Sequence, residues 1–587
     1  MPRLHRTRCN AKIFVSSMLA VVVLLLCALP LVAQDNNTYV QHAVRFAVSP
    51  PLRDLAKLPQ PPHYGFHEAN PVRRVPKRPV GQTRDTVEQS FVVSPAANYS
   101  ILKNFLGVGK GFPNYTVPDA PPDTNMAVGD TQIVQWVNVS YTVCDKSTTV
   151  CGPAVEGNTL WNSLGGVCAA NNDGDIIAQW DRINHRWLLA QNVFVSPYAV
   201  CVAVSQTSDA NGAYYLYQFP VVNKGFPDYP KWGKWPGDWG QTWNNFGPGG
   251  SGFVGPVFCV YNEAKLNSGD PSAEQVCHQY TKTEDSLLPA DLDSPTVPPG
   301  SEDQFAIGSV GDVDNSHLSV YSAHVTLSPF NATFTGDGNS QLVAIAPFTP
   351  ACNGAYGGAC VPQKGVSDFL DSLGDRLMYR FAYYNDSTEQ HWYVNFDVTA
   401  SGGQNGVRWM EFTAPPSPVG PTGISTFQQG TYAPDGNWRW MGSMTRDQNN
   451  DVLVGYSESN NDMYPSIFIA GRTPSDTPGT LEDEVVVVNG TGSQPDTSNR
   501  WGDYSAMRID PTDNCTFWYT TEYYMVTQRF DWRHSDCFGE VFRLRCHQDA
   551  GFVQCLSSLE SQRGYRRRVP AVPRWGRSEH CRNDIQR

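Results

Sequence analysis

The chain has 587 residues, a net charge of -13, 17% charged residues and 12% aromatic residues. The acidic balance excludes a general nucleic-acid binder, because affinity for phosphate needs a basic surface. Few charges, many aromatic side chains and abundant Gly and Pro favour short strands joined by tight turns over long amphipathic helices. The composition therefore predicts an all-β protein.

Residues 1–33 have the pattern of an export signal. Four Arg and Lys side chains in residues 1–12 precede an apolar run from Ile13 to Val32, and Ala33 suits the position before a signal-peptidase cut. We therefore expect a signal peptide and a secreted, periplasmic or cell-surface protein whose mature chain has no membrane span. The alternative is an uncleaved N-terminal helix that anchors the chain, since about 20 apolar residues can span a bilayer.

Residues 34–98 are rich in Pro and lack hydrophobic periodicity, as in PPLRDLAKLPQPPHYGF. This texture predicts an extended leader or spacer. The alternative is a strand or clasp that packs on the edge of the main domain, and Val87–Pro95 could supply it.

One phrase recurs between Asp123 and Trp532: Gly followed by Asp or Ser, a short apolar run, an Asp, a turn, and a second apolar or aromatic run. Its clearest copies begin at Gly174, Gly442 and Gly502. Each copy predicts a β-hairpin whose turn is helped by Asp and Asn. Copies about 60 residues apart in an all-β sequence indicate propeller blades. We predict a β-propeller of six or seven blades over residues 99–532, and the alternative is a series of tandem β-sandwich domains.

Residues 533–587 lose this rhythm. The segment is dense in Arg, contains no Lys, and holds Cys537, Cys546, Cys555 and Cys581. One interpretation is a basic, cysteine-stapled tail for anionic surfaces. The other is an atypical, disordered or out-of-frame end, since an Arg-rich and Lys-free composition is typical of a GC-rich gene read out of frame.

The cysteines of the main domain are disulfide candidates in an oxidising compartment. The expected pairs, two by close spacing and two by elimination, are Cys144–Cys151, Cys352–Cys360, Cys168–Cys201 and Cys259–Cys277. Cys515 is then left over. The absence of a CxxC pair or a Cys/His cluster of finger spacing argues against zinc.

Several phrases are similar to those of a family of large secreted bacterial proteins of the acidobacterial type. They include PPDTNMAVGD at 121–130, LLPADLD at 287–293, DSLGDRLMYRFAY at 371–383 and NRWGDYSAMRIDPTDNCTFWYTTEYY at 499–524. The resemblance covers residues 123–532 and implies a β-propeller that is loosely sialidase-like. It implies no mechanism.

A sialidase-like reaction needs an arginine cluster for the substrate carboxylate, a Tyr activated by Glu, and an acidic proton donor. The candidates are Arg376, Arg439 and Arg500, at equivalent points of three successive predicted blades, with Asp503, Tyr504 and Glu522 close by in the sequence. Against this hypothesis, the S-x-D-x-G-x-x-W box of sialidases is absent. Repeated Arg and Asp can also form structural pairs between blades.

The segment Asn171–Asp175 offers several side-chain oxygens within one turn, as hard cations prefer. Asp173 and Asp175 are therefore candidate Ca2+ ligands. The alternative is ordinary turn chemistry, in which Asp, Asn and Gly are common.

A Trp-rich stretch and a second Trp pair suggest a glycan-binding rim, because exposed aromatic rings stack on sugar faces. The candidates are Trp235, Trp239 and Trp440. The alternative is that these rings fill the gaps between blades.

Two functions remain after these observations. We favour a secreted propeller that binds a glycan or an extracellular protein through loops at one end of its channel. The alternative is a sialidase-like glycoside hydrolase. The hydrolase hypothesis fails if Arg376, Arg439 and Arg500 point into separate blade interfaces.

Overall fold

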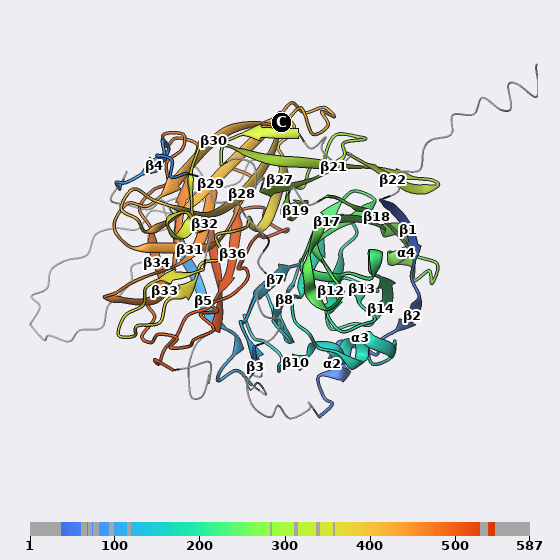
Figure 1. The fold of residues 1–587 in the computed structure, drawn as a ribbon. Coiled ribbons are helices and arrows are strands. Elements are labelled where there is room, and N and C mark those ends of the chain that lie inside the picture. The colour runs from blue at the N-terminus through green and yellow to red at the C-terminus, as the bar shows by residue number, and fades with distance from the viewer. Residues whose placement is uncertain are drawn as a thin grey trace, which may run out of the picture. The chain divides into compact units, whose positions relative to one another are not determined.

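The structure is a computed structural model that describes residues 37–59, 67–68, 73, 75, 81–92, 99–113, 115, 119–281, 284–309, 315–335, 341–355, 358–528 and 538–545. All of them belong to one unit, residues 1–547. The expected signal peptide and the four cysteines of the tail lie outside the described residues. The described part is all-β, with a β-propeller-like arrangement of sheets in place of tandem sandwiches (Figure 1).

Antiparallel meanders of four strands in chain order form most of the sheets. The first of them contain β7 (Thr124–Val128), β8 (Gln132–Val137), β9 (Ser140–Asp145) and β10 (Val155–Glu156); β11 (Ile177–Asp181), β12 (Arg186–Val193), β13 (Ala199–Ser205) and β14 (Tyr214–Pro220); and β15 (Phe226–Trp235), β16 (Asp238–Gly247), β17 (Ser251–Asn262) and β18 (Glu274–Gln279). Their sequences are rich in the β-branched and aromatic residues that suit packed strands. In β13, AVCVAVS, every residue is buried.

The later meanders follow the same order. They contain β19 (Asp285–Leu292), β20 (Gln304–Ser309), β21 (His317–Leu327) and β22 (Phe330–Phe334); β27 (Met378–Asn385), β28 (Gln390–Thr399), β29 (Asn405–Ala414) and β30 (Ser425–Tyr432); β31 (Trp438–Arg446), β32 (Val452–Asn460), β33 (Met463–Arg472) and β34 (Val485–Val488); and β35 (Ala506–Ile509), β36 (Thr516–Thr521) and β37 (Phe538–Arg545). Parallel pairing of β19 with β27 joins two meanders into one larger sheet.

Short elements connect or extend these sheets. The strands are β3 (His67–Glu68), β6 (Asp119–Ala120), β23 (Gln341–Ala344), β24 (Thr349–Pro350), β25 (Ala359–Val361) and β26 (Leu370–Asp371), and the α-helices are α2 (Leu52–Leu55), α3 (Gly166–Ala170), α4 (Glu263–Ser268) and α5 (Ala351–Gly354). None of the helices in the described residues is long and apolar enough to cross a membrane.

The first strands of the meanders form a closed ring. They contact one another in the order β7, β11, β15, β19, β27, β31 and β35, and β35 contacts β7 again. Neighbouring first strands run in the same sense where they pair, as β19 and β27 show. Residues just before these strands are therefore gathered at one end of the ring.

The recurring Asp of the sequence phrase closes the turn after the first strand. Asp181 Oδ1 accepts hydrogen bonds from the backbone N–H groups of Ile183 and Asn184 at 2.8 and 3.0 Å. Asp447 and Asp510 accept equivalent bonds in their own meanders. A side chain that bonds to the backbone two or three residues later stabilises a tight turn, which explains why the phrase recurs.

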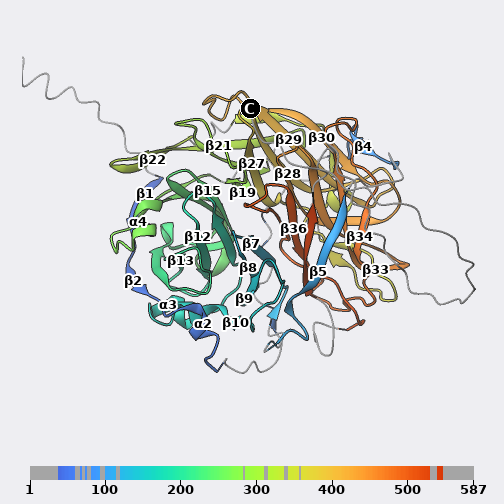
Figure 2. The same cartoon turned by 180° about the vertical axis from the view of Figure 1, so that it is seen from behind.

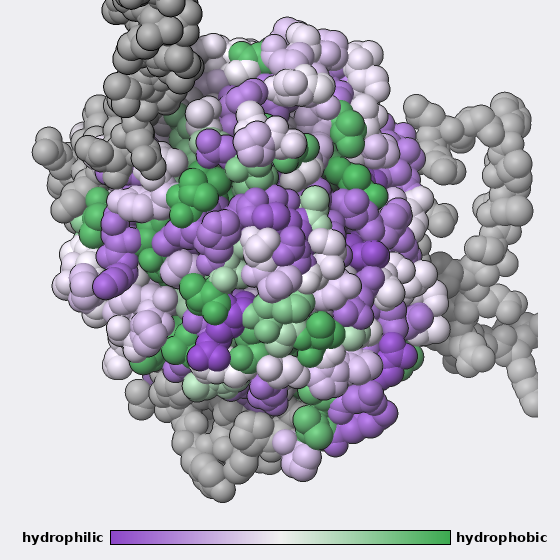
Figure 3. Space-filling view, turned by 90° about the vertical axis from the view of Figure 1, so that its right-hand side faces the viewer, coloured by the Kyte–Doolittle hydropathy of each residue, from purple (hydrophilic) through white to green (hydrophobic). Residues whose placement is uncertain are grey.

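The segment predicted as a leader adds strands to sheet edges. β1 (Thr38–His42) pairs with β18, β2 (Arg45–Val48) pairs with β14, and the short β4 (Glu88–Gln89) pairs with β30. This is the clasp alternative, and it covers strand edges that would otherwise expose unpaired backbone groups. On the face that carries β1 and β2, hydrophobic residues lie in separate groups among hydrophilic ones (Figure 3).

Strand β5 (Ser100–Gly109) completes the last sheet, although it precedes all the meanders in the chain. It pairs with β37, which belongs to the segment predicted as the tail. Figure 2 shows β5, in blue, among the orange and red strands of the C-terminal part. The chain therefore closes its ring by pairing an early strand with a late one.

Four disulfides join pairs of described residues, and they are the four expected pairs, Cys144–Cys151, Cys168–Cys201, Cys259–Cys277 and Cys352–Cys360. Cys515, which the sequence leaves over, is also disulfide-bonded. Each bridge shortens the unfolded chain and typically contributes about 2–4 kcal/mol.

Candidate functional site

Three carboxylates meet where first strands of the ring begin. Asp123 precedes β7, Asp175 precedes β11 and Asp503 precedes β35. One oxygen of each lies within 4.8 Å of the other two. The three residues are only 2%, 2% and 6% exposed. With Glu522, described below, we call these residues the axial cluster.

Local backbone geometry aims these side chains inward. Asp123 and Asp175 have φ angles of 46° and 49°, a left-handed conformation that Asp tolerates better than most residues. Backbone N–H groups then hold the carboxylates. The N–H of Asp503 donates to Asp123 Oδ1 at 2.8 Å, and that of Tyr229 donates to Asp175 Oδ2 at 3.2 Å.

Glu522 is a fourth carboxyl group at the same place. It is 1% exposed, and neither carboxylate oxygen has a hydrogen-bond partner among the described residues. Burial, followed by the charges of Asp123 and Asp503, raises its pKa well above the ordinary value, and Arg500 opposes this rise. A buried carboxyl without donors is costly, so this position is not explained by stability alone.

Two cations face the cluster. Arg500 Nη2 donates to Asp503 Oδ1 at 2.6 Å. Lys231 is fully buried, and its Nζ lies 3.4 Å from the ring centre of Tyr229 and 4.2 Å from that of Tyr504.

Burial shifts the pKa values of Lys231 and Asp175 toward each other. Burial lowers the pKa of Lys231 to about 7, although Asp175, Asp503 and Asp123 raise it. Burial, aided by Asp503 and Asp228, raises the pKa of Asp175 to about 7, and Lys231 opposes this rise. The cluster therefore contains groups that can hold or release a proton near neutral pH.

Two more predicted residues lie beside the cluster but have other bonds. Arg376 Nε donates to Asp375 Oδ1 at 2.8 Å, and its guanidinium lies 4.7 Å from the ring centre of Tyr229. The hydroxyl of Tyr504 donates to the carbonyl of Ile176 at 3.0 Å. Burial raises the pKa of Tyr504 well above its ordinary value, so this hydroxyl is a donor and not an activated nucleophile.

The other predicted residues lie elsewhere. Arg439 is surrounded by Asp435, Glu458 and Glu484 at 2.8, 3.3 and 2.6 Å. Asp173 accepts a hydrogen bond from the backbone N–H of Phe194 at 2.8 Å and is not part of the carboxylate group that contains Asp175. The structure therefore brings together two of the three candidate arginines and separates the two candidate Ca2+ ligands.

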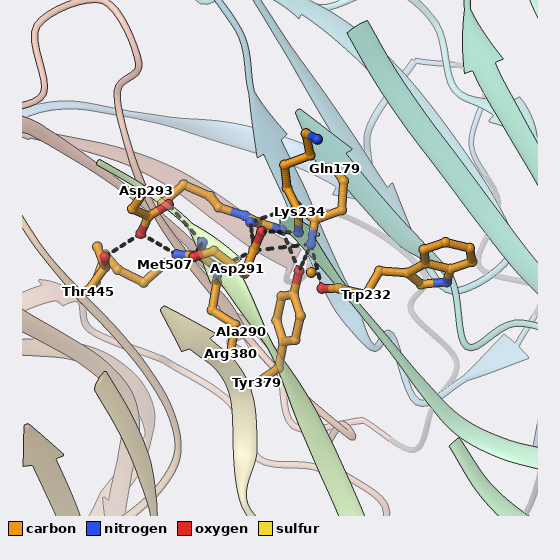
Figure 4. Close-up of polar contacts among 12 residues, drawn as sticks. Gln179, Trp232, Lys234, Ala290, Asp291, Asp293, Tyr379, Arg380, Thr445 and Met507 are labelled. Carbon is orange, nitrogen blue, oxygen red and sulfur yellow. Dashed lines mark hydrogen bonds and ion pairs between the residues drawn. The ribbon is translucent and has the colours of Figure 1, made fainter. Parts of the chain in front are cut away.

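Further along the first strands lies a second charged group, the axial network (Figure 4). Asp291 accepts hydrogen bonds from Arg380 Nε at 2.8 Å and Arg508 Nη1 at 2.7 Å. Arg380 Nη2 also donates to Asp293 Oδ1 at 2.7 Å. Burial alone would raise the pKa of Asp291, but Arg380 and Arg508 together lower it below its ordinary value.

The axial network binds several first strands to one another. Asp293 also accepts from Thr445, and Gln179 donates to Asp291 and to the hydroxyl of Tyr379. A cavity of about 20 Å³ beside it holds no more than a water molecule. The sequence analysis missed this network, although its signal was available: LLPADLD places Asp291 inside an apolar run and Asp293 directly after it, where buried charges require partners.

A groove of about 490 Å³ lies between the β15–β16 hairpin and strands β20 and β21. Its lining includes Trp235, Asp238, Gln304 and His324. Asp238 is 1% exposed, and its Oδ1 has no hydrogen-bond partner among the described residues. Burial raises the pKa of Asp238 to about 7, and Lys234 opposes this rise. The side-chain carbonyl of Gln304 also has no partner in the described part.

The three candidate tryptophans are buried. Trp239 and Trp440 are 0% exposed, which favours the alternative that they fill space between sheets. Trp235 is 3% exposed, but it forms part of the groove wall. Its ring lies 4.8 Å from that of Tyr383, and its indole N–H donates to the carbonyl of Glu302 at 3.1 Å.

No family model and no curated protein matches the chain. Among solved structures, a protein of unknown function from Dyadobacter fermentans is similar at 9% identity, covering 77% of this chain and 100% of that chain, with a TM-score of 0.32. The phage phi92 endosialidase is similar at 8% identity, over 79% and 71% of the two chains, with a TM-score of 0.36. Bacillus subtilis levansucrase is similar at 8% identity, over 65% and 94%, with a TM-score of 0.27. Similarity at this level carries no functional argument.

Proposed function

We propose that the protein is a secreted β-propeller of seven blades that binds a neutral glycan in the groove lined by Trp235 and Asp238. The ring supports this count, because each of the strands β7, β11, β15, β19, β27, β31 and β35 begins one meander. The predicted signal peptide and the four disulfides support secretion.

The observation that carries the proposal is the unmet hydrogen-bonding capacity of the groove. Asp238 Oδ1 and the carbonyl of Gln304 are both acceptors, and neither has a donor among the described residues. Leaving such a group unsatisfied costs roughly 1–3 kcal/mol. Both oxygens are shielded from solvent, so a ligand rich in hydroxyl groups would supply the missing donors once these side chains turn toward the groove, whose wall includes Trp235.

The size and charge of the groove favour a neutral sugar. Its volume of about 490 Å³ lies within the roughly 300–1,000 Å³ of small-molecule sites. Among the described residues that line it there are two acids, Asp238 and Glu302, and no Lys or Arg, so an anionic sugar would meet like charges. We therefore expect neutral oligosaccharides to bind and sialylated ones not to bind.

A glycan array and titration calorimetry with the mature chain test this function. Asp238→Asn should weaken binding of the selected neutral glycan at least tenfold, because charge-assisted hydrogen bonds to the carboxylate are lost. The matched control is Asp397→Asn, which changes another buried Asp whose Oδ1 also has no partner in the described part but which is not part of the groove lining. The control should bind as the wild type does. Absence of glycan binding, or equal binding by Asp238→Asn, contradicts the proposal.

A second candidate is a sialidase-like glycoside hydrolase, and one observation favours it. Arg376, Arg500, Asp503, Tyr504 and Glu522, all predicted from the sequence, converge near the axial cluster. Their low exposure and the hydrogen bond of Tyr504 to a carbonyl argue against it. A panel of fluorogenic glycosides separates the two candidates: turnover that Asp503→Asn abolishes establishes the hydrolase, and binding without turnover establishes the first function.

A further inference from the structure

We infer that the axial cluster binds one divalent, oxygen-preferring cation, for which Ca2+ is the probe. This site is separate from the proposed glycan groove, and it differs from the Ca2+ site expected at Asp173 and Asp175. Its ligands are Asp123, Asp175 and Asp503, and the carboxyl group of Glu522 lies beside them.

The spacing of the oxygens suits a single ion. Oxygens of Asp123, Asp175 and Asp503 lie within 4.8 Å of one another. Ca2+ binds oxygens at about 2.3–2.6 Å, so two ligands on opposite sides of the ion are about 5 Å apart. All three carboxylates can therefore touch one ion without a change of backbone.

Glu522 provides an independent observation. It comes from the segment after β36, and not from the start of a first strand as the three Asp residues do. It is 1% exposed, neither of its oxygens has a partner in the described residues, and the charges of Asp123, Asp503 and Arg500 act on it. A cation at the cluster would offset the charge of this carboxylate, to which no protein donor bonds in the described residues.

The buried groups carry an excess of negative charge when all are ionised. Four carboxylates contribute -4, Arg500 with Lys231 contributes +2, and buried Asp228 adds a further negative charge that acts on Asp175. Arg376 does not change this balance, because it is paired with Asp375. A divalent ion would neutralise most of this charge.

A second acidic group in the described residues differs from the axial cluster because it already contains a cationic side chain. Asp435, Glu458 and Glu484 also bring three carboxylates together, but the guanidinium of Arg439 already lies among them. The place of a cation is taken there by a side chain. Glu458→Gln is therefore the matched control for Glu522→Gln.

The test uses the mature chain after treatment with a chelator. Ca2+ should raise the melting temperature beyond the effect of NaCl at equal ionic strength, and calorimetry should give one ion per chain. Tb3+ should bind at the same site, with luminescence sensitised by Tyr229 and Tyr504, and Ca2+ should displace it. Glu522→Gln should reduce Ca2+ affinity at least tenfold, and Glu458→Gln should leave it unchanged.

The inference is overturned if Ca2+ has no effect beyond ionic strength, or if Glu522→Gln binds Ca2+ as tightly as the wild type. If Glu522→Gln does not fold, Asp175→Asn replaces it, with the same two outcomes. Glycan binding measured with Ca2+ and with chelator keeps the two proposals distinguishable, because the groove residues do not belong to the cluster.

Discussion

The ring of first strands carries two buried charged groups with different balances. In the axial network, two arginines, Arg380 and Arg508, face two aspartates, Asp291 and Asp293. In the axial cluster, four carboxyl groups lie near two cations, Arg500 and Lys231, and Glu522 has no hydrogen-bonded oxygen in the described residues. The axial network, with balanced charges, stabilises the ring of first strands. The axial cluster carries an excess of negative charge, which a bound cation can neutralise.

The largest expected effect comes from breaking the balanced group. Arg380→Met leaves Asp291 and Asp293 buried with fewer cations, and removing one partner of such a pair typically costs about 3–5 kcal/mol. Urea unfolding measures the change. The control is Arg53→Met, which removes an exposed pair with Asp209 and should cost less than about 1 kcal/mol. Equal effects of the two substitutions contradict the role of the axial network.

The next effect concerns the pH dependence of stability and Asp238, one of the two acidic residues among the described residues that line the groove. The pKa of Asp238 is raised from 3.8 to about 7 in the folded protein. Between these values the unfolded chain loses the proton while the folded chain keeps it, so stability falls as pH rises from about 4 to 7. Asp238→Asn should remove this contribution, at most about 4 kcal/mol.

Unfolding of the wild type and of Asp238→Asn at a series of pH values measures this difference. The variant should gain relative stability as pH rises and keep a constant advantage above about pH 8. A variant that is more stable and yet binds glycan more weakly indicates a residue retained for binding. A difference that does not change with pH shows that Asp238 is not the titrating group.

A smaller difference in stability is expected between substitutions of Tyr379, in the axial network, and Tyr504, beside the axial cluster. The hydroxyl of Tyr379 accepts hydrogen bonds from Gln179 and Arg508 in the axial network, whereas that of Tyr504 makes one bond, to the carbonyl of Ile176. Tyr379→Phe should cost about 1–3 kcal/mol, because it leaves buried donors unsatisfied, and Tyr504→Phe about 1 kcal/mol. Thermal unfolding compares them. If Tyr504→Phe also abolishes turnover of a glycoside, the hydrolase is the correct function.

The smallest effect on stability is expected for Glu522, whose carboxylate has no hydrogen-bond partner in the described residues. Glu522→Gln keeps the shape of the side chain and breaks no hydrogen bond in the described residues, so the stability of the chelator-treated protein should change by less than about 1 kcal/mol. Unfolding of this variant beside Arg380→Met measures the comparison directly. If Glu522→Gln lowers the free energy of unfolding as much as Arg380→Met does, then Glu522 has a structural partner, which contradicts its role beside a ligand site.

The sequence predicts several parts of the site because the repeat carries them. Arg500, Asp503 and the residues around Gly174 stand at equivalent points of the repeated phrase, and equivalent points of a ring meet at its axis. Asp123 and Lys231 were missed, since their copies of the phrase are looser. Arg439 has the same position in the phrase but a different neighbourhood, because Glu458 and Glu484 surround it.

By itself the sequence determined what short-range chemistry controls. Turns closed by Asp181 or Asp447, strands rich in β-branched residues, and cysteines a few residues apart all depend on neighbours in the chain. Only the tertiary structure decided which charged groups meet. Asp291 with Arg508, or Asp123 with Asp503, are joined across hundreds of residues by closure of the ring, and closure also sets which of them find counter-ions.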